Sequence, residues 1–75
     1  MNAGTRYAVI FEGDTATGYS AYAPDLPGCI ATGKTLDETR ERMRGALEFH
    51  IRGLREDGNP VPEPTVHAEA VNVAA

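Results

Sequence analysis

Acidic side chains are the most abundant groups in this sequence that could perform chemistry. The chain has eleven aspartate and glutamate residues against seven lysine and arginine residues, and its formal net charge is −4. Carboxylates that converge on a divalent cation would indicate a metal-dependent nuclease, with one carboxylate in the middle of the first strand. The first expected strand offers only Glu12, near its end, and the acidic residues of the expected helix alternate with arginines. The pattern therefore favours solvated surface carboxylates over a catalytic set.

The two histidines and the single cysteine do not form a metal-binding or nucleophilic motif. His50 falls on the apolar face of the expected helix, and His67 lies beyond a proline-rich spacer, without a second cysteine or His-x-x-x-His spacing. Cys29 would need a cation or a helix N-terminus to lower its pKa, and Lys34 is a neighbour that the sequence does not exclude. We expect Cys29 to be a small buried apolar residue. The sequence thus predicts no catalytic residue, no metal site and no cofactor.

Length and charge restrict the class of protein further. Seventy-five residues form one domain, 1–75, with a small core, so self-association would be a useful source of buried area. A negative net charge disfavours binding to nucleic acid, which requires clustered lysine and arginine. The sequence shows no signal-peptide pattern and no apolar run that could span a membrane. We therefore expect a cytoplasmic homo-oligomer with a basic protein partner and no contact with a membrane.

Alternating apolar residues predict short strands on both sides of a single helix. Strands are expected over about residues 5–13, 18–23, 29–33 and 65–73, separated by polar or proline-rich segments. The order β-β-β-α-β predicts an α+β fold, in which a small antiparallel-led sheet carries one helix packed on one face.

The helix, expected over about residues 36–57, has the strongest local signals. Thr35 is a favourable N-cap, Glu38 completes a capping box with it, and Gly58 is placed to end the helix in a left-handed conformation. Its apolar face is expected to consist of Leu36, Met43, Leu47 and Leu54.

The most specific motif lies between the second strand and the helix. The segment Tyr22-x-Pro24-Asp25-Leu26-Pro27-Gly28-Cys29 precedes Thr32-Gly33-Lys34-Thr35-Leu36, and the helix ends at Glu56-Asp57-Gly58 before Pro60, Pro62 and Pro64. This arrangement resembles the HicB antitoxin family over nearly the whole chain. The resemblance implies a partial ribonuclease H-like fold without that enzyme's activity, and a domain that neutralises a small basic messenger-RNA-cleaving toxin, HicA. Longer relatives carry a C-terminal DNA-binding domain, and because this chain ends at Ala75 we expect no direct binding to nucleic acid.

Five residues are candidates for contact with such a partner. Glu12, Asp14 and Asp25 supply negative charge that would attract a basic toxin, and Leu26 follows Asp25 in the same loop. Phe49 projects away from the apolar face of the helix, where it could contact a partner or a second subunit. An alternative interpretation is an orphan oligomeric scaffold or a small-ligand-binding domain without a toxin. A residual nuclease, the third possibility, would have to bind a divalent metal.

Overall fold

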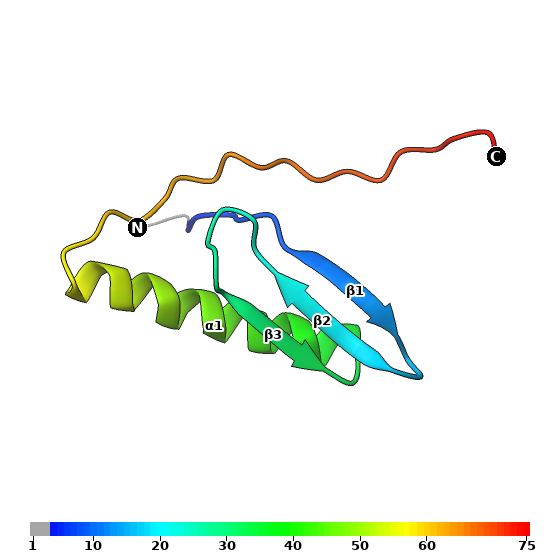
Figure 1. Cartoon of the computed structure of the whole chain (residues 1–75), viewed down its shortest axis with the longest axis horizontal. Coiled ribbons are helices and arrows are strands. Elements are labelled where there is room, and N and C mark those ends of the chain that lie inside the picture. The colour runs from blue at the N-terminus through cyan, green and yellow to red at the C-terminus, as the bar shows by residue number, and fades with distance from the viewer. Residues whose placement is uncertain (1–3) are drawn as a thin grey trace.

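The computed structural model describes residues 4–75, which contain three strands and one helix. In chain order these are β1 (Ile10–Asp14), β2 (Gly18–Tyr22), β3 (Ile30–Gly33) and α1 (Leu36–Glu56). The strands form one antiparallel sheet in the order β1-β2-β3, and α1 lies across one face of it (Figure 1). The expected α+β class, with an antiparallel sheet and one helix on one face, is confirmed.

A tight hairpin sets the register between β1 and β2. Asp14 Oδ1 accepts hydrogen bonds from the backbone N–H groups of Ala16 and Thr17, at 2.9 and 2.8 Å. Gly13 has a φ of +120°, and a Cβ at this position would lie 2.1 Å from the carbonyl oxygen of Gly18. Only glycine fits such a backbone approach. The resulting register pairs Phe11 with Ala21 and Ile10 with Tyr22, and the next ladder pairs Tyr22 with Ile30.

The core lies between α1 and the inward face of the sheet. Its buried apolar members are Ala21, Ala23, Leu26, Cys29 and Met43, against which Phe11, Ala31, Leu47, Ile51 and Leu54 pack. The expectation that Cys29 is buried is therefore confirmed. Thr39 is also buried, whereas Leu36, expected on the apolar face of the helix, is 42% exposed. The helix side chains that face the sheet begin with Thr39. Because Gly33 has no side chain, β3 can approach the first turn of α1 closely at this point.

Side-chain and backbone caps close both ends of α1. Thr35 Oγ1 accepts a hydrogen bond from the Glu38 N–H at 3.0 Å, as a capping box requires. Glu38 Oε1 accepts from the N–H of Lys34 at 2.8 Å, one residue before the expected Thr35 donor. At the other end Gly58 adopts a φ of +73°, and the N–H of Asn59 donates to the carbonyl of Leu54. The helix expected over residues 36–57 is thus observed as Leu36–Glu56.

The expectation of a fourth strand over residues 65–73 is wrong for the single chain. Within the described residues this segment is extended but belongs to no sheet, and Figure 1 shows it running clear of the strands toward the C-terminus. The first strand is also shorter than expected, because it begins at Ile10 and not at residue 5. β1 is short because its partner β2 ends at Tyr22, and Pro24 has no N–H with which to continue the ladder. Residues 5–9 therefore have no strand opposite them.

Candidate partner-binding surface

The face of the sheet opposite α1 is exposed and partly apolar. Because Ala21 and Phe11 point toward the helix, the alternate residues of each strand point the other way. Ile10, Tyr22 and Ile30 are register partners and form an apolar row across all three strands, with Tyr22 42% and Ile30 68% exposed. We call the outward surface of the sheet the open face; its residues are Ile10, Glu12, Ser20, Tyr22, Ile30 and Thr32.

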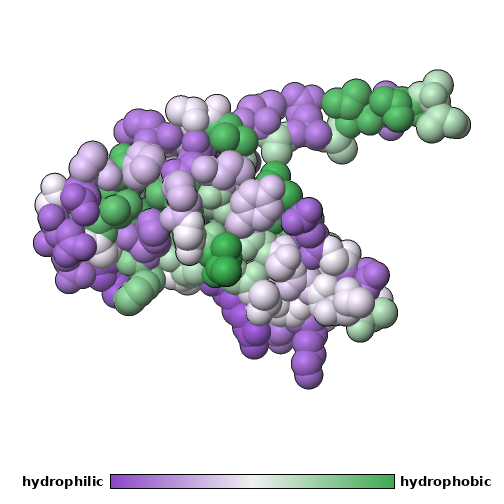
Figure 2. Space-filling view, in the orientation of Figure 1, coloured by the Kyte–Doolittle hydropathy of each residue, from purple (hydrophilic) through white to green (hydrophobic). Residues whose placement is uncertain are grey.

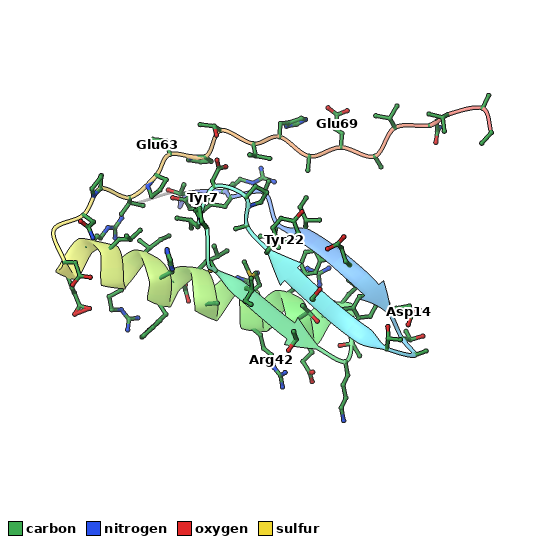
Figure 3. The ribbon with its side chains drawn as sticks, viewed as in Figure 1. Tyr7, Asp14, Tyr22, Arg42, Glu63 and Glu69 are labelled. Atoms are coloured by element: carbon green, nitrogen blue, oxygen red, sulfur yellow. The ribbon has the colours of Figure 1, made fainter. Side chains whose placement is uncertain are left out.

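Two of the predicted contact residues, Glu12 and Asp14, lie on β1, where Glu12 follows Ile10 on the open face and Asp14 ends the strand. Glu12 is the open-face neighbour of Ser20 and is exposed. Asp14 lies at the tip of the β1–β2 hairpin, at the opposite end of the sheet from Tyr7 and Glu63 (Figure 3). Hydrogen bonds from the N–H and hydroxyl of Thr17 and from the N–H of Ala16 hold the pKa of Asp14 below its usual 3.8. Glu12 therefore places negative charge beside the apolar row, and Asp14 places negative charge at the hairpin tip.

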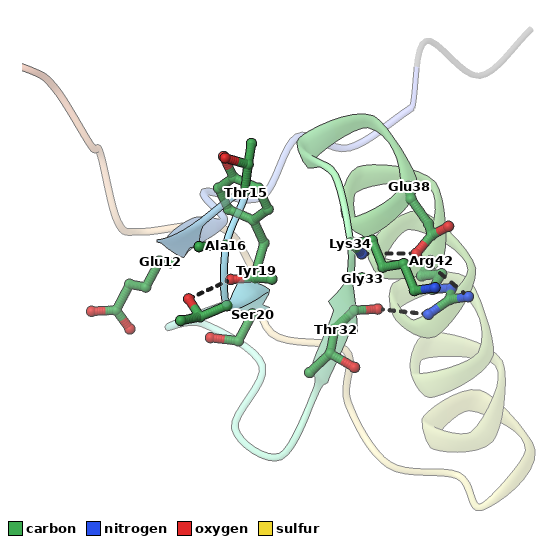
Figure 4. Close-up of a pocket in the computed structure, with 13 residues that line it drawn as sticks. Glu12, Thr15, Ala16, Tyr19, Ser20, Thr32, Gly33, Lys34, Glu38 and Arg42 are labelled. Carbon is green, nitrogen blue, oxygen red and sulfur yellow. Dashed lines mark hydrogen bonds and ion pairs between the residues drawn. The ribbon is translucent and has the colours of Figure 1, made fainter.

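A polar hollow of about 1140 Å³ lies between the hairpin and the start of α1. Glu12 and Ser20 line one side and Lys34 and Arg42 the other, as Figure 4 shows. Arg42 donates a hydrogen bond to the carbonyl oxygen of Thr32 at 3.0 Å and forms an ion pair with Glu38 at 3.6 Å. The hollow thus lies between the acidic side chain of Glu12 on β1 and the basic side chains of Lys34 and Arg42 near the start of α1.

Asp25, the third acidic candidate, holds the C-terminal segment in place. Its two carboxylate oxygens accept hydrogen bonds from the Thr65 N–H at 3.0 Å, the Thr65 hydroxyl at 2.7 Å and the Val66 N–H at 3.1 Å. These hydrogen bonds lower the pKa of Asp25 below its usual 3.8, and the bond from the Thr65 hydroxyl has the largest effect. Nearby, the Tyr7 hydroxyl donates to the carbonyl oxygen of Pro62 at 2.6 Å. We call these contacts the Asp25 clasp.

The remaining two candidates occupy different environments. Leu26 is 1% exposed and belongs to the core, so in the single chain its side chain supports the loop from inside. Phe49 is 72% exposed on α1, well away from the open face on the other side of the sheet. The five candidates thus do not form one contiguous patch. Glu12 and Asp14 lie together, whereas Asp25, Leu26 and Phe49 lie elsewhere.

Sequence reasoning missed the exposed members of the apolar row. Ile30 begins a short strand next to buried Cys29, and an isoleucine in such a place is usually a core residue. The signal that could have revealed it is the alternation of β3, in which Ala31 and Gly33 are small enough to face the closely packed helix. Ile30 and Thr32 must then face outward.

The side chains of the described residues offer surfaces for binding more than groups for catalysis. In residues 4–75 no group of three or more His, Cys, Asp or Glu side chains is arranged to hold a metal ion. Burial raises the pKa of the Cys29 thiol, which opposes formation of a thiolate nucleophile. The helix of the described chain is not apolar enough to cross a membrane.

Comparison of the sequence with known proteins shows similarity to antitoxins of bacterial toxin–antitoxin systems. The sequence model described as "HicB_like antitoxin of bacterial toxin-antitoxin system" matches residues 7–74. The chain therefore belongs to the HicB-like antitoxin family.

The individual relatives include one that is named an antitoxin. Antitoxin HicB 2 of Photorhabdus laumondii is 33% identical over 70 residues, which are 93% of this chain and 50% of that protein. A UPF0150 protein of Synechocystis is 30% identical over 89% of this chain and 85% of its own length. An uncharacterised 14.9 kDa protein of Haemophilus phage HP1 is 36% identical over 73% of this chain, which spans 41% of the phage protein.

Proposed function

We propose that this chain binds and neutralises a small basic HicA-like toxin that cleaves messenger RNA, and that it does so with the open face and the acidic end of β1. The observation that carries the proposal is the apolar row of half-buried Ile10 and exposed Tyr22 and Ile30, with Glu12 beside it and Asp14 at the hairpin tip. An apolar strip with charge at its rim is the usual anatomy of a protein interface. Membership of an antitoxin family supports a toxin as the partner.

Charge and apolar contact have separate roles in this proposal. The net charge of −4 attracts a basic protein and raises the association rate. Burial of Ile30 and Tyr22 supplies affinity, because both side chains are exposed in the single chain and lose contact with water in a complex. The chain acts by occluding the toxin and contributes no catalytic group of its own. In this proposal it works in the cytoplasm, forms a homo-oligomer, and binds neither nucleic acid nor membrane directly.

Co-expression with the product of the adjacent small open reading frame tests the proposal, with growth rescue and co-purification as readouts. The Ile30→Glu variant should lower affinity by at least about tenfold, because it places a charge at the centre of the interface. Glu12→Lys should slow association at low salt, whereas Glu41→Lys, an equal charge change on exposed α1, is the matched control.

Three outcomes separate the possible binding surfaces. If Phe49→Glu abolishes binding while Ile30→Glu does not, the partner binds α1 and the open face is the wrong surface. If Asp25→Lys alone weakens binding, the clasp loop is the contact. Absence of toxicity, rescue and complex would favour the alternative of an orphan scaffold or ligand-binding domain.

A further inference from the structure

The C-terminal segment, residues 65–73, has the form of a strand without a neighbour. The Asp25 clasp fixes Thr65 and Val66, and beyond them the chain continues extended and joins no sheet within the described residues. Figure 2 shows green side chains near the end of this segment, which stands apart from the rest of the molecule. Val71 and Val73 are 75% and 78% exposed. An extended segment with unpaired backbone groups and exposed valines is suited to adding to a sheet edge.

The alternation of this segment gives it two different faces. Thr65, His67, Glu69, Val71 and Val73 point to one side if the segment is a strand, and Val66, Ala68, Ala70 and Asn72 to the other. The first set combines the paired side chains of His67 and Glu69, whose nitrogen and oxygen lie 2.8 Å apart, with two valines at its C-terminal end. A surface that binds this face of the segment should therefore offer positive charge near Glu69 and apolar side chains beneath Val71 and Val73.

Such a surface lies beside β1, which is an edge of the sheet. Because α1 packs mainly against β3 and β2, a groove of about 990 Å³ remains between the helix and the segment from Gly4 to Phe11, which leads into β1. Phe11, Leu47 and Ile51 contribute apolar side chains to it, and Arg40, Arg44 and Arg52 contribute charge. Arg40 lies 5.8 Å from the centre of the Phe11 ring. The groove is therefore apolar inside and basic at its rim, although Glu48 and Glu56 also line it.

We propose that residues 67–73 of one copy add to the outer edge of β1 in a second copy and lie over this groove. Val71 and Val73 then cover the apolar floor, and Glu69 lies near the arginines. The exchange is reciprocal, so two identical contacts form and the assembly closes as a two-fold dimer. The clasp directs the segment away from its own sheet, as Figure 1 shows, which favours a second copy as the acceptor.

Sedimentation equilibrium of the isolated chain over a range of concentrations tests this inference, independently of any toxin. The wild type should have twice the 8.0 kDa mass of one chain. Val71→Asp combined with Val73→Asp should weaken the dimer by about tenfold or more, because it places charges on the apolar floor. Both valines are exposed in the single chain, so the fold should survive, as circular dichroism can verify. Asn72→Asp, on the opposite face between them, is the matched control and should leave the dimer intact.

Cross-linking between two different copies identifies the acceptor edge. Chains carrying Ala70→Cys are mixed with mass-tagged chains carrying Glu12→Cys and treated with a short bis-maleimide; buried Cys29 does not compete. A mixed cross-linked dimer supports exchange. A monomeric wild type overturns the proposal, and so does equal weakening by the Asn72→Asp control. It is also overturned if a single chain carrying both Ala70→Cys and Glu12→Cys cross-links only within itself, since the segment then pairs with its own β1.

Discussion

The contact between Gly33 and Thr39 provides the sharpest test of how the helix is seated on the sheet. A Cβ at Gly33 would lie 2.6 Å from Thr39 Oγ1 and 2.9 Å from the Thr39 backbone nitrogen. Ordinary contact begins at 3.4 Å, so Gly33→Ala requires the first turn of α1 to move away from β3. A rotation of the Thr39 side chain would not relieve the clash, because the backbone nitrogen is also too close.

The cost of this substitution follows from the constraint on Thr39. This residue is buried, and its hydroxyl donates to the carbonyl oxygen of Thr35 at 2.7 Å. Overpacking of a well-packed site destabilises proteins by about 1–3 kcal/mol. In a domain of this size each 1 kcal/mol lowers Tm by about 4–8 °C. Thermal unfolding followed by circular dichroism, at one fixed chain concentration, should therefore show a loss of several degrees or more.

Gly45→Ala and Gly53→Ala are the controls, because they add the same methyl group at positions where it meets no neighbour. A Cβ at Gly45 or Gly53, both within α1, would meet nothing within 4 Å. Alanine at either position should stabilise the helix by about 0.5–1 kcal/mol. The reasoning is refuted if Gly33→Ala unfolds at the wild-type temperature, or if Gly45→Ala destabilises the chain as much as Gly33→Ala does.

Three further predictions concern the cap, the clasp and the thiol. Thr35→Ala should lower the free energy of unfolding by about 1 kcal/mol in urea denaturation, because the Glu38 N–H loses its acceptor. Because the pKa of Asp25 is lower in the folded chain than its usual 3.8, the clasp should be complete above pH 3.8 and open as the pH falls through that lowered value. The protection of the Thr65 amide, measured as its intrinsic exchange rate divided by its observed rate, should fall correspondingly, and in Asp25→Ala this protection should be lost at every pH. Cys29 should react with a thiol reagent at pH 8 much more slowly in the native chain than in urea, since burial raises its pKa; equal rates would show that the loop around it is open.

Local sequence signals predicted the elements well where the interactions that form them are local. The N-cap at Thr35 depends on a hydrogen bond between residues three positions apart, and Gly58 ends the helix through its own backbone conformation. The β1–β2 hairpin likewise depends on Asp14 and the residues directly after it. Such contacts can be inferred from residue types and spacing because few other arrangements satisfy the same groups.

Predictions failed where two distant parts of the chain had to meet. The hydrogen bonds between Asp25 and Thr65 are not predictable from local sequence, because forty residues separate the two. Residues 65–73 have the alternation of a strand, yet alternation does not specify a neighbour, and the clasp holds this segment away from its own sheet. The exposure of Ile30 depends on which face of β3 the helix covers.

The sequence by itself determined the family, the α+β class, the helix with its caps and the burial of Cys29, because these depend on local hydrogen bonds, short periodicities and a specific motif. Only the tertiary structure decided which surfaces remain available. The placement of α1 over β2 and β3 leaves the open face and the groove beside β1 uncovered. That placement results from the packing of small residues such as Gly33 and Ala31 against Thr39 and Met43, a fit in three dimensions that no spacing along the chain encodes.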